Sequence, residues 1–127
     1  MSTKDTCCTL VPYFSVHEGK MGEFKQLCQA FVEKTSTEDK CMFYGFSFSG
    51  NEAHCREGYE DAEGVLSHLE NVAAIFEQAL NIADITRLEV HAPQSQLDQL
   101  KAPLSHLSPQ LFTLEMGFRR SGIAEAV

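Results

Sequence analysis

Several features that would point to a familiar function are missing from this 127-residue chain. It contains no tryptophan, no Cys-x-x-Cys pair and no His-Glu-x-x-His motif. Its ten Lys and Arg residues form no run, and the net charge of −8 repels phosphate backbones. These absences argue against nucleic-acid binding, and we also predict that the chain has no metal site.

Long apolar segments are missing as well. No apolar run approaches the ~20 residues that span a bilayer, and the first residues, MSTKDTCC, lack the apolar stretch of a secretory signal. The five cysteines are an odd number in a chain without an export signal, which favours reduced thiols over a disulfide framework. We therefore predict a cytoplasmic protein that has no membrane partner.

What the chain does contain is typical of one globular domain over residues 1–127. Hydrophobic residues make up 43% of the sequence and charged residues 22%, which are ordinary values for a globular protein. No repeat, low-complexity segment or linker divides the chain. At this length the domain can bury a core of its own.

Hydrophobic periodicity predicts alternating strands and helices. The predicted strands are residues 8–16, a hairpin within 41–61, 84–92 and 110–118, and the predicted helices are 17–36, 61–83 with a break near Asn71, and 94–107. We expect Asp61 to cap the second helix, and Pro12 to cause a bulge or a gap in the first strand. Through residue 92 the order is β-α-β-β-α-β, the ferredoxin-like α+β plan with both helices on one side of the sheet. An α-β extension over about residues 93–119 follows.

The turn at Gly50 and Asn51 fixes the register of the predicted hairpin. The expected pairs are Phe48 with Ala53, Phe46 with Cys55, Tyr44 with Glu57 and Met42 with Tyr59. Directly paired side chains share a face, so this face carries large apolar groups around one carboxylate. The reverse face of the first hairpin strand, with Phe43, Gly45 and Ser47, has no charge.

No helix of the predicted plan covers that reverse face of the sheet. Burying apolar surface stabilises a protein by roughly 25 cal/mol per Å², so an uncovered face favours association. A symmetric pair of chains, packed sheet face against sheet face, would bury it. We therefore expect a homodimer.

The segment REGYEDAEGVLSHLENV, residues 56–72, resembles the antibiotic biosynthesis monooxygenase (ABM) domain of the dimeric α+β barrel superfamily. The matching residues are Glu57, Tyr59, Asp61, Ala62, His68 and Leu69. VHEGKMGEFKQL resembles the loop into the first helix of that family, and CMFYGFSFS resembles the segment after its next turn. The likeness covers about residues 9–92, with Tyr59 where the family commonly has tryptophan.

The resemblance implies ferredoxin-like protomers that form a dimeric α+β barrel, with an apolar pocket between helices and sheet. It also implies a monooxygenase that acts on a small aromatic or quinol-type molecule with O₂ and without a cofactor. Haem-degrading relatives use an asparagine and a histidine where this chain has Pro12 and Gln78, so we expect no haem site.

Two residues are candidates for proton transfer. His68 lies on the inward stripe of the second predicted helix, and its imidazole can exchange a proton near neutral pH. Glu57 is a carboxylate on an apolar strand face, where burial would raise its pKa and suit a general acid or base. The alternatives are a core histidine with a satisfied hydrogen bond, and a carboxylate held structurally by Tyr44, Tyr59 or a backbone amide.

The remaining site candidates are predicted walls of a substrate pocket: Tyr59, Tyr44, Phe46, Cys55, Leu69 and Val72. The two tyrosines can stack on an aromatic ligand or simply fill the core. The sequence thus leaves three functions open. These are a cofactor-free monooxygenase, a non-catalytic ligand-binding or structural module of the same fold, and an isomerase or decarboxylase of an enolisable substrate.

Overall fold

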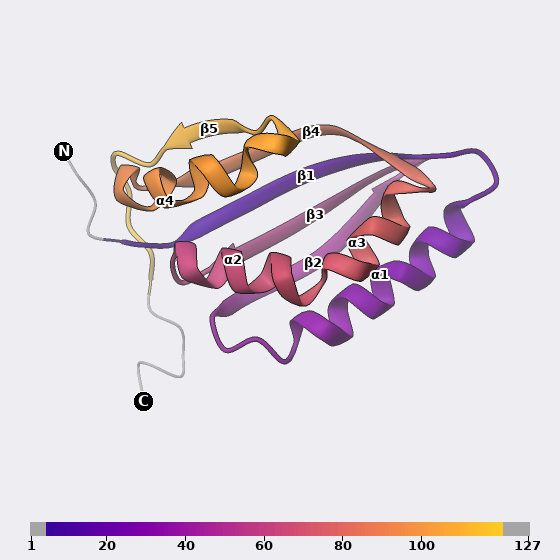
Figure 1. Cartoon of the computed structure of the whole chain (residues 1–127), viewed down its shortest axis with the longest axis horizontal. Coiled ribbons are helices and arrows are strands. Elements are labelled where there is room, and N and C mark those ends of the chain that lie inside the picture. Colours follow the sequence, from indigo (N-terminus) through magenta and orange to yellow (C-terminus); the bar gives the residue numbers. More distant parts are fainter. Residues whose placement is uncertain (1–4, 121–127) are drawn as a thin grey trace.

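The computed structural model describes residues 5–120 as a single sheet with helices packed against one face (Figure 1). The elements are β1 (Cys8–Val16), α1 (Met21–Thr35), β2 (Cys41–Ser49), β3 (Glu52–Tyr59), α2 (Ala62–Asn71), α3 (Ala73–Leu80), β4 (Ala83–Ala92), α4 (Gln94–Leu104), the short 3₁₀ helix η1 (Ser105–Leu107) and β5 (Gln110–Thr113). Among these residues no helix is both long and apolar enough to cross a bilayer.

The strands lie in the order β2-β3-β1-β4-β5. The pairs β2-β3, β3-β1 and β1-β4 are antiparallel, and β5 runs parallel to β4. Every second residue of β1 is buried, because that side of the sheet faces the helices (Figure 1). The predicted ferredoxin-like plan with an α-β extension is confirmed.

The hairpin of β2 and β3 has the predicted register over most of its length. Phe48 lies opposite Ala53, Phe46 opposite Cys55 and Tyr44 opposite Glu57. The predicted pair of Met42 with Tyr59 is wrong, because the register shifts between Cys41 and Phe43 and Cys41 takes that place. Met42 is thus the extra residue of a β-bulge, which bends the strand end.

Pro12 interrupts the pairing of β1 as expected. The ladder between β1 and β3 passes from Leu10 to Tyr13 without a pair at Val11 or Pro12. On its other side, β1 shifts register against β4 just after Tyr13. Proline lacks the N–H that a ladder bond needs, so this prediction is confirmed.

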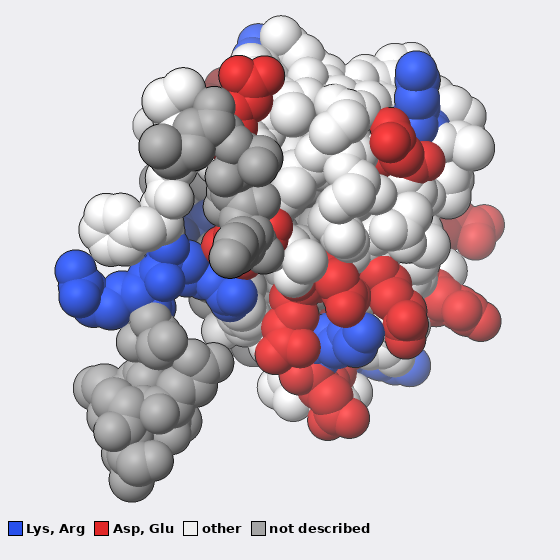
Figure 2. Space-filling model, turned by 90° about the vertical axis from the view of Figure 1, so that its left-hand side faces the viewer, with Lys and Arg blue, Asp and Glu red and all other residues white. Residues whose placement is uncertain are grey.

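The second predicted helix divides into α2 and α3 at Val72, next to the expected break at Asn71. Asp61 caps α2, as predicted, by accepting a hydrogen bond of 2.9 Å from the backbone N–H of Gly64. Lys40 forms ion pairs with Asp61 and Glu63 at the same end of the helix. Figure 2 shows acidic side chains gathered around one basic side chain on this end of the molecule.

The C-terminal strand is shorter than predicted. β5 ends at Thr113, and the Met116 and Phe118 side chains, which were expected on one strand face, are 68% and 83% exposed. Its partner β4 stops at Ala92 because Pro93 follows and α4 begins. Beyond that point the described chain offers no neighbouring strand for residues 115–118.

The core consists of two clusters along the helix-facing side of the sheet. One cluster surrounds Leu10, Tyr59 and the buried leucines of α4, and the other surrounds Phe14, Phe24 and Phe31. The reverse face of the sheet carries ring contacts between its own side chains. These are Tyr13 on His54, Arg56 on Phe43, and His91 stacked on Phe112.

Candidate functional site

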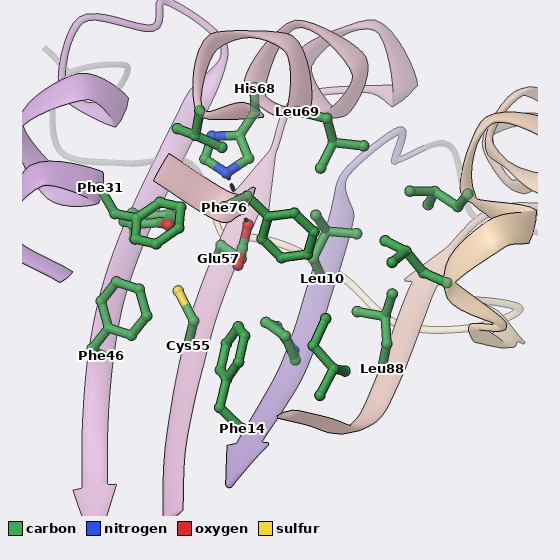
Figure 3. A pocket seen from close by; sticks show the side chains of 16 residues that line it. Leu10, Phe14, Phe31, Phe46, Cys55, Glu57, His68, Leu69, Phe76 and Leu88 are labelled. Atoms are coloured by element: carbon green, nitrogen blue, oxygen red, sulfur yellow. Dashed lines mark ion pairs between the residues drawn. The ribbon is translucent and has the colours of Figure 1, made fainter. Parts of the chain in front are cut away.

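A cavity of about 50 Å³ lies between the helices and the sheet, where the two core clusters meet. Figure 3 shows His68 and Leu69 projecting into it from the helix side, opposite strand residues that include Glu57 and Cys55. The lining residues are Leu10, Pro12, Phe14, Phe31, Tyr44, Phe46, Cys55, Glu57, His68, Leu69, Val72, Phe76, Ile85, Leu88, Leu104 and Leu107. Apart from the Glu57 carboxyl, the His68 imidazole, the Tyr44 hydroxyl and the Cys55 thiol, the walls are hydrocarbon.

The structure brings seven of the eight predicted site residues together in this lining: His68, Glu57, Tyr44, Phe46, Cys55, Leu69 and Val72. Tyr59 is the exception. It is fully buried beside the cavity and donates its hydroxyl to Oε1 of Glu57 at 2.7 Å. Tyr59 therefore contacts the site through Glu57 and not as a wall.

Strand register explains how the polar groups converge. In β2 and β3, Tyr44 pairs with Glu57 and Phe46 with Cys55, and alternation turns these four side chains toward the helices. His68 faces these side chains from the helix layer, because it is buried on the inward face of α2, three residues after Val65. Three neighbouring elements thus supply the polar groups of the cavity.

The imidazole of His68 is contacted by two carboxyl groups and two tyrosine rings. Its Nδ1 lies 2.9 Å and 3.1 Å from the two carboxylate oxygens of Glu38, and its Nε2 lies 3.5 Å from Oε1 of Glu57. The rings of Tyr44 and Tyr59 lie 5.2 Å and 5.1 Å from the imidazole. Burial lowers the pKa of His68, against the opposing effect of the Glu38 carboxylate.

Glu57 is only 5% exposed. Burial raises its pKa from 4.5 to about 7, although hydrogen bonds from Tyr59 and Cys55 stabilise the charged form. A carboxyl group with this pKa holds and releases its proton near neutrality, which is the range that general acid–base catalysis requires. The site therefore contains a carboxyl and an imidazole that can each exchange a proton.

Two further groups in the lining are neutral hydrogen-bond donors. Burial raises the pKa of the Tyr44 hydroxyl and of the Cys55 thiol far above neutrality. Neither group ionises easily: the thiol donates to Glu57, and the tyrosine hydroxyl can donate to a negatively charged oxygen in the cavity. The arrangement can remove a proton from a bound molecule and stabilise the anion that forms.

Sequence reasoning missed two polar residues that support this site and several residues of its wall. Glu38, which accepts from His68, lies in the loop between α1 and β2, where no hydrophobic period marks a position as buried. Asn71 donates to Glu38 at 2.9 Å, but in the sequence it indicated only a helix break. Wall residues from α3 and from the C-terminal extension, such as Phe76 and Leu104, were missed because periodicity does not show which apolar stripe borders a void.

The part of the chain that the structure describes holds no group of three or more His, Cys, Asp or Glu side chains arranged to bind a metal ion. His68 is instead engaged by Glu38 and faces Glu57.

The fold resembles several solved structures. MupZ from Pseudomonas fluorescens superimposes with a TM-score of 0.90, covers 94% of each chain and is 45% identical in sequence. The "Putative antibiotic biosynthesis monooxygenase from Nitrosomonas europaea" has a TM-score of 0.66 over 74% of this chain and 96% of its own, at 14% identity. Rv0793 from Mycobacterium tuberculosis has a TM-score of 0.61 over 68% of this chain and 94% of its own, at 21% identity.

No protein-family model and no curated protein matches the chain. The identity to MupZ extends over nearly the whole length of both chains, and the more distant structures share the ferredoxin-like core. The chain therefore belongs to the same family as MupZ, and it shares its fold with the ABM-like structures.

Proposed function

We propose that this protein is a cofactor-independent monooxygenase that oxidises a small aromatic or quinol-type molecule with O₂. The observation that carries the proposal is the buried pair of Glu57 and His68 at the wall of an apolar cavity, with Nε2 and Oε1 3.5 Å apart. ABM-like proteins with this core, among them the Nitrosomonas europaea protein, carry the monooxygenase name. The site itself supplies the acid–base groups.

In the proposed reaction the substrate supplies the electrons. Glu57, in its ionised form and assisted by His68, removes a proton from the substrate, and the resulting anion reduces O₂ and forms a C–O bond to it. The Tyr44 hydroxyl donates a hydrogen bond to the developing oxyanion. The proton returns to the peroxide, water leaves, and a CH₂ group has become C=O with no external reductant.

The size of the cavity limits how the substrate enters. About 50 Å³ is well below the ≈300–1,000 Å³ of typical ligand pockets. Phe76 of α3 and Leu107 of η1 are half-buried lining residues on separate elements. We expect these two side chains to move outward when a single aromatic ring binds.

An oxygen-electrode assay over a panel of quinols, phenols and anthrones tests the proposal. We expect O₂ uptake in proportion to product, and losses of roughly 100-fold or more in kcat for Glu57→Gln and for His68→Ala. Glu52→Gln, an exposed change on the same strand, is the matched control and should keep full activity. Because the base acts when ionised, kcat/KM should rise with pH through an apparent pKa of about 7. Full turnover by a variant that lacks both groups would remove their assigned roles.

A redox-neutral reaction is the second candidate. The specific observation that favours it is that His68 stands between two carboxyl groups, Glu38 and Glu57, an arrangement suited to moving a proton both to and from a substrate. An isomerase or decarboxylase of an enolisable molecule would use the same residues. Product formation without O₂ consumption distinguishes this reaction from oxygenation.

The non-catalytic alternative predicts binding without turnover. The small cavity fits this reading, because a nearly filled core leaves little room for a substrate. Isothermal calorimetry with the same panel separates the two: a ligand that binds and is recovered unchanged, with and without O₂, would favour a ligand-binding module.

A further inference from the structure

We propose that Glu38 and Asn71 form a positioning clamp that fixes His68 with its proton on Nδ1 and its lone pair on Nε2. The role of this tautomer in turnover rests on the proposed acid–base function. The orientation itself follows from the hydrogen bonds around His68 and can be measured without a substrate. Neither Glu38 nor Asn71 lines the cavity, so both act on a bound molecule only through His68.

The clamp begins at a backbone carbonyl. The amide nitrogen of Asn71 donates to the carbonyl oxygen of Lys34 at 3.0 Å and to Oε2 of Glu38 at 2.9 Å. Both partners only accept hydrogen bonds, so both amide hydrogens are committed. The Asn71 amide cannot be flipped without facing its oxygen toward these acceptors, and its direction is therefore fixed.

Glu38, oriented by Asn71, in turn orients the imidazole of His68. Its side chain is only 9% exposed, and both of its oxygens lie within 3.1 Å of Nδ1 of His68. A carboxylate offers no hydrogen to donate. The proton of a neutral imidazole therefore lies on Nδ1, and Nε2 carries the lone pair.

The consequence is a basic nitrogen that faces the second carboxyl group. Nε2 lies 3.5 Å from Oε1 of Glu57, longer than an ordinary hydrogen bond of ≈2.9 Å. The groups packed against His68 are Glu38 from the loop after α1, Glu57 and Tyr59 from β3, and Tyr44 from β2. The two tyrosine rings packed against the imidazole oppose its rotation, so its two nitrogens keep these partners.

Local sequence accounts for the geometry. Asn71 is the last residue of α2 and lies three positions after His68, which places the two side chains on neighbouring parts of one helix face. Glu38 follows α1 closely, and the carbonyl of Lys34 lies in the last turn of that helix. The clamp thus connects the ends of two helices to one imidazole.

Glu38→Gln tests the clamp because Asn71 dictates how the introduced amide must turn. The oxygen of that amide has to accept from Asn71, so it takes the place of Oε2, and the NH₂ group takes the place of Oε1 at 3.1 Å from Nδ1 of His68. Nδ1 then faces one donor beside one acceptor instead of two acceptors, so the tautomer with its proton on Nε2 gains population. Long-range ¹H–¹⁵N NMR of the imidazole, with the His68 signals assigned by their loss in His68→Ala, reads this change directly.

A double variant adds a readout that general destabilisation would not reproduce. In Glu38→Gln combined with Asn71→Ala the introduced amide is free to turn, so its oxygen can accept from Nδ1. We expect the original tautomer to reappear in the double variant. Asp39→Asn, an exposed acid-to-amide change at the adjacent loop position, is the matched control and should leave the tautomer unchanged.

The outcomes separate this inference from the proposed function. We expect a shift toward the Nε2–H tautomer in Glu38→Gln and a loss of kcat of up to about 10⁴, with KM nearly unchanged, as for a histidine held in the wrong tautomer. An unchanged tautomer in that variant, or a shift with full kcat, overturns the positioning role. If no substrate is turned over by any form of the protein, the proposed function fails, and the tautomer measurements alone decide the inference.

Discussion

Glu57 shows how much of this site can be predicted at the scale of one residue. The Gly50-Asn51 turn and strand alternation placed it beside Tyr44 on the helix-facing side, and the structure has that pairing. The proposed role of His68 likewise followed from its helical spacing. Glu38 could not be found this way, because its burial depends on how a loop folds over α2.

The shifted pKa of Glu57 predicts a pH-dependent stability. As pH rises from 4.5, the unfolded chain releases this proton while the folded protein retains it until about pH 7. Glu57 therefore lowers the free energy of unfolding progressively over that interval. His68 acts in the opposite sense, because its lowered pKa reduces stability as pH falls below 6.5.

Glu57→Gln isolates this contribution. The free energy of unfolding of the variant relative to the wild type should increase by about 3 kcal/mol between pH 4.5 and pH 8, from a shift of roughly 2.5 pKa units. Urea unfolding at the two pH values measures it, with Glu52→Gln as the control. A difference that stays constant with pH would show that Glu57 titrates normally.

At the scale of elements, boundaries and register were predictable where a local signal exists. The Gly50-Asn51 turn, the Asp61 cap and Pro12 each act within a few residues, and the structure has the turn, the cap and the interrupted pairing. The bulge at Met42 and the early end of β5 were not predictable. Both depend on what the neighbouring strand does, which residue spacing does not report.

The start of α2 offers a test of close packing. A Cβ added at Gly64 would lie 2.9 Å from Cβ of Lys40 and 3.3 Å from Cβ of the buried Tyr59. Gly64→Ala should therefore destabilise the protein by roughly 1–3 kcal/mol, although alanine is the better helix former.

Gly22→Ala in α1 is the matched change, because nothing lies within 4 Å of its added Cβ. It should be neutral or stabilise the protein by up to about 1 kcal/mol. Thermal or denaturant unfolding of the two variants measures the contrast. Equal effects of the two substitutions would contradict the packing described at Tyr59.

At the scale of the whole molecule, the reverse face of the sheet remains the basis for a predicted homodimer. The sequence indicated that no helix covers this face, and in the structure the described helices lie on the other side (Figure 1). Which surface a second chain contacts depends on shape over several strands. The dimeric α+β barrel is therefore still a prediction.

Sedimentation equilibrium tests the dimer. We expect the wild type at twice the chain mass, and Val11→Asp, a charge in the middle of the reverse face, at or near the mass of one chain. Val32→Asp on the outer surface of α1 is the control and should leave the assembly intact. A wild type that sediments as a single chain would remove the predicted partner.

The central claim is that Glu57, beside His68, holds and releases a proton near neutral pH inside an apolar cavity. The most direct measurement is a ¹³C NMR titration of the Glu57 side-chain carboxyl in the wild-type protein, assigned by loss of its signal in Glu57→Gln. The account predicts a midpoint of about 7. A midpoint near 4.5 would mean an ordinary, ionised carboxylate, and would contradict the claim.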